Sequence, residues 1–145
     1  MIHQKDLRLG DLVQITVDLP EYKQGDIFVV IDISEIYIGL RSPSESDCRQ
    51  DLYTIRDHIE SIRLTPDILE KNGWNKKHDP TSSCDIYSKG KDAFYVSLEQ
   101  SIYKKQEGFD FVVADSTYRF GNKLQYVHEL QHILWALGED ANLKI

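Results

Sequence analysis

The segment His128–His132 (HELQH) has the H-E-x-x-H pattern of zinc-dependent peptidases. On a helix, two imidazoles four residues apart lie on the same face, where both can bind Zn²⁺. The glutamate between them can then activate a zinc-bound water. Read in this way, the chain is a minimal zinc-dependent hydrolase with His128 and His132 as metal ligands and Glu129 as the general base.

Two features of the sequence argue against this interpretation. Catalytic zinc needs a third protein ligand, and the extended pattern H-E-x-x-H-x-x-G-x-x-H would place Gly at 135 and His at 138, where this chain has Trp135 and Gly138. The apolar residues recur at helical spacing, which predicts that His128 and His132 lie on the opposite, exposed side. The pattern therefore favours a surface helix with two incidental histidines, and no catalytic residue, metal ligand or cofactor is predicted.

The charge of the chain is acidic and unevenly distributed. The net charge is −7; residues 1–70 contain 14 Asp and Glu against 7 Lys and Arg, whereas residues 71–145 contain 10 of each. An acidic front half argues against the attraction to phosphates that drives most nucleic-acid binding. The exception is a basic group interrupted by three aspartates, and it consists of Lys71, Lys76, Lys77, His78, Lys89 and Lys91. A solvated loop explains this group better than a phosphate-binding patch does, so a nucleic-acid binder ranks last.

Three tyrosines in the first sixty residues are candidates for a binding surface. Tyr22, Tyr37 and Tyr53 would form an exposed aromatic strip of the kind that some peptide-binding domains use. The sequence does not place them on one face. Packing of these rings in the core or at its rim is therefore the favoured alternative.

The elements that must position these residues begin with short strands. Runs of β-branched and apolar residues between turn residues predict strands at 12–17, 27–33, 36–41, 52–55 and 59–64. Several short strands in about sixty residues are typical of a small barrel, so an SH3-like β-barrel is predicted for residues 1–64.

The second half, residues 65–145, begins with a short helix. Thr65 is a suitable N-cap, Pro66 suits the first helical position and Gly73 suits the residue after the helix. A polar linker follows, and then strands are predicted at 84–89, 93–99 and 109–114. Asn122 is the expected cap of a final helix that reaches about residue 137. The predicted fold class is α+β, with the barrel, the short helix and a three-stranded antiparallel sheet packed by the C-terminal helix into one compact unit.

Size and composition are those of a small folded domain. The chain has 145 residues, of which 41% are hydrophobic and 28% charged. No apolar run approaches the ~20 residues of a membrane span, and the first residues lack the apolar core of a signal peptide, so a cytoplasmic location is expected. In that compartment Cys48 and Cys84, which lie in polar surroundings, are expected to be free thiols.

Two segments together resemble one protein family. Residues 62–74 (IRLTPDILEKNGW) and residues 126–131 (YVHELQ) are similar to the I-x-L-T-x-x-x-L-x-K-x-G-F/W segment and the Y-V-H-x-L-Q helix of small uncharacterised proteins from Bacteroidetes genomes and their phages or mobile elements. The resemblance implies an accessory protein that serves a phage or mobile element. It further implies that Glu129 and His132 are not shared by the family, and it carries over no catalytic residue.

The leading functional hypothesis is a non-enzymatic, cytoplasmic protein-binding module. Its partner is expected to be another protein, because the acidic front half would favour a basic surface, and not nucleic acid or a membrane. A DNA-mimicking protein is a variant of this hypothesis, and it requires the acidic side chains to share one face. The zinc-dependent hydrolase remains the alternative from a different class.

Overall fold

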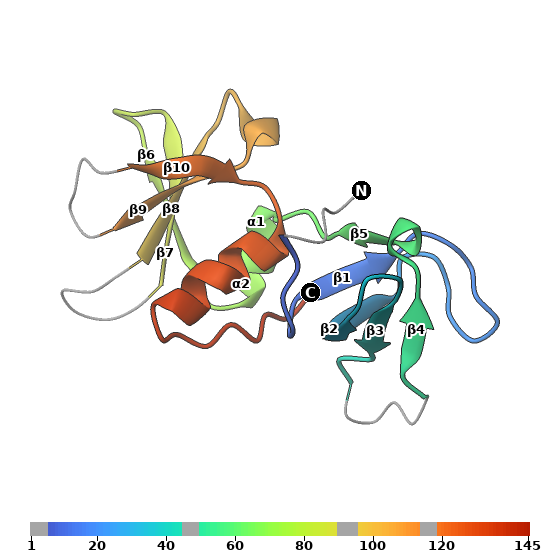
Figure 1. Ribbon diagram of the computed structural model, residues 1–145. Coiled ribbons are helices and arrows are strands. Elements are labelled where there is room, and N and C mark those ends of the chain that lie inside the picture. Colours follow the sequence, from blue (N-terminus) through green and yellow to red (C-terminus); the bar gives the residue numbers. More distant parts are fainter. Residues whose placement is uncertain (1–5, 45–49, 90–95, 114–118) are drawn as a thin grey trace. The chain divides into compact units, whose positions relative to one another are not determined.

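The computed structural model describes residues 6–44, 50–89, 96–113 and 119–145. The chain divides into two compact units, Met1–Ile62 and Arg63–Ile145. Each unit contains one five-stranded antiparallel sheet, and the few helices are short, so the fold is mostly β (Figure 1). Among the described residues, no helix is both long enough and apolar enough to span a membrane.

The first unit is an open antiparallel sheet with the strand order β4-β3-β2-β1-β5. Its strands are β1 (Leu12–Ile15), β2 (Ile27–Ile33), β3 (Ile38–Arg41), β4 (Leu52–Thr54) and β5 (Ile59–Ser61). The predicted SH3-like barrel is therefore wrong, because β4 and β5 are the two edges and, in the described residues, do not pair with each other. Both edge strands are only three residues long and are separated by a 3₁₀ turn, Arg56–His58. The alternation on which the prediction rested is the same in an open sheet and in a barrel.

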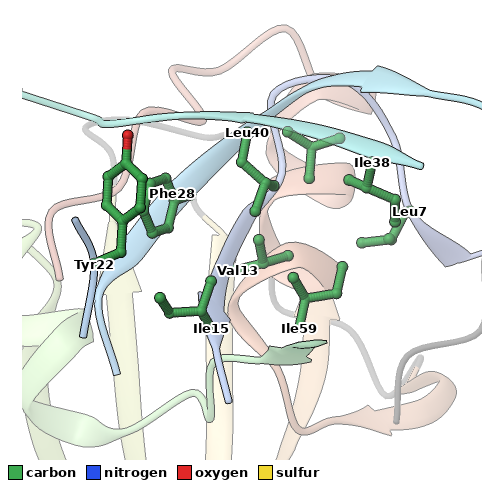
Figure 2. Packing of buried hydrophobic residues seen from close by; sticks show 9 residues of the cluster. Leu7, Val13, Ile15, Tyr22, Phe28, Ile38, Leu40 and Ile59 are labelled. Atoms are coloured by element: carbon green, nitrogen blue, oxygen red, sulfur yellow. The ribbon is translucent and has the colours of Figure 1, made fainter. Parts of the chain in front are cut away.

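One face of this sheet carries the core of the first unit. Figure 2 shows its side chains gathered from several strands and from the segments before β1 and β2. The nine buried members are Leu7, Val13, Ile15, Tyr22, Phe28, Val30, Ile38, Leu40 and Ile59. Full burial of one such side chain contributes about 1.5–3 kcal/mol to the stability of the fold. Because side chains alternate along a strand, the residues buried on this face determine which residues point outward.

The second unit contains a five-stranded meander with the order β10-β9-β8-β7-β6. Its strands are β6 (Asn75–Asp79), β7 (Cys84–Lys89), β8 (Val96–Ser101), β9 (Phe109–Val113) and β10 (Arg119–Leu124). The predicted three-stranded sheet is therefore wrong, because both edge strands were missed. β6 has the sequence NKKHD, so it offers no apolar alternation, and β10 occupies the start of the helix that was predicted to begin at Asn122.

Two helices lie beside this sheet, α1 (Pro66–Lys71) and α2 (Val127–Ala136) (Figure 1). The predicted start of α1 is confirmed, since the Thr65 hydroxyl accepts a hydrogen bond from the Ile68 N–H at 3.4 Å and Pro66 opens the helix. Gly73 has a φ of 80°, as the residue after a helix requires. The C-terminal segment runs back to α1, where the Asn72 side chain exchanges hydrogen bonds with the backbone of Lys144.

Candidate functional site

The glutamate of the H-E-x-x-H segment caps helix α2. Glu129 Oε2 accepts hydrogen bonds from the backbone N–H of Gln125 at 2.6 Å and of Tyr126 at 2.9 Å. These donors lie at the N-cap of α2 and one residue before it, where backbone N–H groups have no partner inside the helix. The carboxylate therefore has a structural role in this conformation, and it is not positioned as the general base of a metal-bound water.

The two histidines are not the exposed residues that the helical spacing predicted. His128 is buried, with 4% of its surface exposed, and His132 is partly buried. Four rings follow one another along the helix: His128 stacks on Tyr126 at 5.9 Å between centroids, His132 meets His128 at 5.7 Å, and His132 stacks on Trp135 at 5.8 Å. Ring packing accounts for the placement of both imidazoles.

The sequence prediction failed for His128 because α2 is covered from more than one direction. Gln131, which a one-sided helix would also expose, is 2% exposed, and its amide donates to the carbonyl of Ala141 at 3.2 Å. The chain after the helix therefore folds back over a face that the apolar periodicity alone assigns to solvent.

The described part of the chain offers no third ligand for the zinc interpretation. Residues 6–44, 50–89, 96–113 and 119–145 contain no group of three or more His, Cys, Asp or Glu side chains that could hold a metal ion. The alternative hydrolase with His128, Glu129 and His132 thus gains no support from this structure.

A different charged cluster lies at the edge of the second sheet. Asp85 on β7 is 7% exposed, and its two carboxylate oxygens lie 3.0 Å from Lys76 Nζ and 3.0 Å from His78 Nδ1. Lys76 faces Tyr87 and His78 faces Asp85 in the register of β6 and β7. Since directly opposed residues share one face of a sheet, these side chains form one cluster across the two strands.

The electrostatics of this cluster depend on Asp85. Burial alone raises the pKa of Asp85, but the hydrogen bonds and charges of Lys76 and His78 outweigh it, and the net pKa is lowered. The same carboxylate raises the pKa of Lys76. Burial raises the pKa of the neighbouring Tyr87 phenol, over whose ring Lys76 Nζ lies at 5.7 Å from the centroid. The cluster is internally neutralised, as expected of a structural ion pair.

These contacts show that the basic residues grouped in the sequence do not form one continuous cationic patch. Lys76 and His78 are bound to Asp85, and Lys71 donates to the backbone oxygen of Ile145. Lys91 lies outside the described residues. The described members are thus divided between α1 and the strands β6 and β7. This arrangement does not favour binding to the phosphate backbone of a nucleic acid.

The three tyrosines of the first unit separate into one core residue and two surface residues. Tyr22 is 6% exposed, contacts Phe28 edge-on at 5.1 Å, and donates its hydroxyl to the carbonyl of Gln50 at 2.6 Å. Tyr37 and Tyr53 are 52% and 58% exposed. The favoured prediction of core packing is therefore confirmed for Tyr22, whereas Tyr37 and Tyr53 are surface residues.

Tyr37 and Tyr53 belong to a larger exposed apolar surface. Tyr53 pairs with Gly39, and because Ile38 and Thr54 point inward, Tyr37, Tyr53 and Ile55 face outward. Ile36 precedes Tyr37 and is 65% exposed. We call this surface the outer β3–β4 face, made of Ile36, Tyr37, Tyr53 and Ile55.

A glycine shapes this face. A Cβ atom at Gly39 would lie 3.0 Å from Tyr53 Cε1 and 2.8 Å from Asp32 Cβ, so the Tyr53 ring lies across the glycine. At the far end of the same strands, Arg41 and Asp51 form a two-pronged salt bridge with both contacts at 2.8 Å. Beside the apolar side chains, Asp32 and Glu35 are exposed.

Sequence reasoning missed part of this surface. Ile36 and Ile55 were assigned to strands without an exposed role, and the available signal was the alternation of Leu52 and Thr54 with Tyr53 and Ile55. Of the two cysteines, Cys84 is a free thiol, as predicted, whereas Cys48 lies outside the described residues.

Comparisons with protein-family models, with curated proteins and with solved structures find no match to this chain.

Proposed function

We propose that the protein is a non-enzymatic protein-binding module. In this proposal the outer β3–β4 face docks a segment of a partner protein that carries apolar anchors flanked by Lys or Arg. The observation that carries it is that Tyr37, Tyr53 and Ile55 face outward at one sheet edge, with Ile36 in the turn before Tyr37, and that each of the four is at least 41% exposed. Contiguous exposed apolar side chains of this kind mark interaction surfaces, and tyrosine is enriched among residues that dominate binding energy.

The charge of the first unit supports a basic partner. Residues 1–62 contain 12 Asp and Glu against 6 Lys and Arg, and Asp32 and Glu35 lie exposed beside the apolar residues. Opposite charge at the rim of an interface steers association and selects partners, while the buried centre supplies most of the affinity. A segment with apolar centre and basic flanks satisfies both requirements.

The family resemblance supports a role in a phage or mobile element. The segments 62–74 and 126–131, which carry that resemblance, include helix α1 and the start of helix α2. We therefore place the partner among proteins of the phage or of its host. This placement rests on the resemblance and not on the contacts of the outer β3–β4 face.

The proposal is tested by selecting peptides from a displayed random library on the whole protein. The selected peptides should carry aromatic or aliphatic residues next to Lys or Arg, and their affinity should fall as salt is raised from about 50 to about 300 mM. We expect Tyr53→Ser to weaken the best peptide by at least about tenfold, the usual effect of removing a central aromatic anchor.

Tyr103→Ser is the matched control, because Tyr103 is the most exposed tyrosine of the described residues, at 81%, and lies in the second unit. Its affinity should equal that of the wild type. Acidic selected peptides, or equal losses from Tyr53→Ser and Tyr103→Ser, would contradict the proposal.

A further inference from the structure

The edge strand β4 of the first unit has backbone groups that its sheet does not use. β4 lies at one end of the strand order β4-β3-β2-β1-β5 and, among the described residues, pairs only with β3 (Figure 1). In an antiparallel sheet the N–H and C=O of one residue point to the same neighbouring strand, and those of the next residue point to the other side. Every second residue of β4 therefore directs both groups away from the sheet.

The hydrogen bonds at the β2–β3 turn determine which residue of β4 does so. The Ser34 N–H donates to the Tyr37 carbonyl at 3.0 Å, so the Tyr37 backbone points to β2. Ile38 follows Tyr37, so its N–H and C=O point to β4, where Ile38 faces Thr54. Thr54 therefore bonds to β3, and the N–H and C=O of Tyr53, one residue earlier, point off the edge of the sheet.

Two other sets of hydrogen bonds agree with this alternation. Ile55 points the same way as Tyr53, and its carbonyl accepts from the His58 N–H at 3.1 Å instead of bonding to β3. On the other side of the sheet, the Val30 N–H and C=O bond to the segment just before β1 at 2.9 and 2.7 Å. Alternation from Val30 through β3 to β4 again directs Tyr53 outward. Within the described part of the chain, no strand lies on that side to receive these two groups.

β4 also differs from the edge strands β5 and β6 in what its side chains offer. β4 has the sequence LYT, without charge, glycine or proline, and its Tyr53 is exposed. β5 carries Glu60, which accepts from the Gln14 amide at 2.6 Å, and its Ile59 is buried. β6 has the sequence NKKHD. Charged residues on an edge strand oppose pairing with another chain, so β4 is the edge suited to such pairing.

We propose that the partner segment of the outer β3–β4 face binds as an extended strand added antiparallel to β4. This inference rests on the proposed function and specifies how the partner binds. One partner residue faces Tyr53 and exchanges both backbone hydrogen bonds with it, as in other cases of strand addition. Its side chain, and those two positions away, lie on the outer face and pack on Tyr53 and Ile55.

The form and the charge of the partner follow from the same surface. A helix laid over this face bonds its own backbone, whereas an extended strand uses the N–H and C=O of Tyr53. On the inner side, Leu52 packs against the core, so an apolar partner residue opposite Leu52 extends that core. Asp32 and Glu35 are exposed beside the outer face, which favours Lys or Arg at the flank of the segment. A second copy of this chain would bring the same negative charges together.

The test is an N-methyl scan of the best selected peptide, measured by calorimetry on the whole protein. Methylation of one backbone amide at a time removes its N–H donor. An added strand directs only alternate N–H groups to β4, so we expect losses of at least about tenfold at every second position and less than about threefold at the positions between. Equal losses at neighbouring positions, or no loss at any position, overturn the strand addition.

Hydrogen exchange of the Tyr53 amide provides a readout on the protein itself. In the free protein this amide should exchange at close to the rate of an unstructured chain, and saturating peptide should slow it at least about tenfold. The Thr54 amide, which points to β3, is the matched control and should be protected in both states. A Tyr53 amide that is protected in the free protein would show that the edge is already covered, by a second copy or by another segment, and would overturn the inference. An unprotected amide in the saturated complex would do the same.

The two proposals fail separately in these experiments. Peptides that bind Tyr53→Ser and Tyr103→Ser equally well contradict the docking surface, and the strand addition fails with it. Peptides that need Tyr53 but show no alternation in the N-methyl scan leave the docking surface in place and overturn only the strand addition.

Discussion

The edge strands β6 and β4 of the two sheets differ in what they expose. β6 carries Lys76, Lys77 and His78, and Lys76 and His78, which share one face of the sheet with Asp85 of the next strand, both contact its carboxylate. β4 carries Tyr53, which is 58% exposed and lies among the apolar side chains of the outer β3–β4 face. Two sheets with the same number of strands and the same antiparallel pairing therefore expose very different surfaces.

This difference indicates which edge is suited to a partner. Charged side chains on an edge strand, lysine above all, oppose pairing with other chains, because their desolvation is costly. Exposed aromatic and aliphatic side chains have the opposite effect, since their burial in a complex is favourable. The charge cluster on β6 and β7 thus stabilises the second sheet and opposes pairing of its edge with other chains. The outer β3–β4 face is the surface whose burial by a partner would be favourable.

The largest effect is expected from removing the carboxylate that neutralises β6. Asp85→Ala leaves Lys76 and His78 without their common partner, and we expect the free energy of unfolding to fall by about 2 to 3 kcal/mol. Urea unfolding followed by tryptophan fluorescence measures this change, because both tryptophans, Trp74 and Trp135, lie in the second unit. Lys77→Ala is the control and should stay within about 0.5 kcal/mol of the wild type. Superimposable curves for Asp85→Ala and wild type would show that the cluster is not structural.

A somewhat smaller effect is expected at Gly39, under the Tyr53 ring. In Gly39→Ala the new methyl group would meet Asp32 Cβ at 2.8 Å and the Tyr53 ring at 3.0 Å, so strand or ring must shift. We expect a loss of about 2 kcal/mol in stability together with weaker binding of the selected peptides. Gly25→Ala provides a comparison at a site with open space but a positive φ of 92°. It should lose stability by backbone strain while the folded protein keeps its peptide affinity. Unchanged peptide affinity in Gly39→Ala would show that this glycine does not shape the binding surface.

Glu129 at the start of helix α2 is a second carboxylate of this unit that is bound by groups of the same unit, and its removal is the next prediction. Glu129→Ala removes the acceptor of two backbone N–H groups, and we expect it to cost about 1 to 2 kcal/mol. Glu129→Gln keeps one amide oxygen and should recover about half of that loss. Thermal unfolding by circular dichroism measures both variants. A stability unchanged by Glu129→Ala would contradict the capping role and reopen a chemical role for this glutamate.

The smallest effect is a difference in acid sensitivity. Because the pKa of Asp85 is lowered in the folded protein, its stabilising contribution is complete above the ordinary value of 3.8 and is lost as the pH falls through the folded pKa. We therefore expect Asp85→Asn to flatten the loss of stability between about pH 5 and pH 2, as measured by tryptophan fluorescence. Asp51, whose pKa is lowered by the hydrogen bond from the exposed Arg41, should contribute little, and Asp51→Asn is the control. Equal acid curves for Asp85→Asn and wild type would contradict this assignment.

The sequence predicts the regular parts of this fold and misses the edge strands of the second sheet. The strands Ile27–Ile33 and Cys84–Lys89 and the helix Pro66–Lys71 follow from apolar runs and helix caps that the structure retains. The edge strand β6 is exposed along its length, so it lacks the apolar pattern that identifies a strand. Closure of a sheet depends on pairing between distant strands, which local patterns do not encode, and the barrel was therefore inferred wrongly.

The candidate surface was predictable only in part, for a similar reason. Tyr37 and Tyr53 were recognised as surface candidates, but Tyr22 lies in a loop, where no alternation indicates which way a ring points. Gln131 is buried where it contacts the returning C-terminal segment, and helical periodicity cannot predict such a contact.

The most direct test of the docking surface is to map where a selected peptide binds on the whole ¹⁵N-labelled protein. Amide shifts should concentrate on residues 36–39 and 53–55 and should disappear in Tyr53→Ser, while Tyr103→Ser retains them. Shifts centred on β6 or on α2, with the outer β3–β4 face unchanged, would contradict the account.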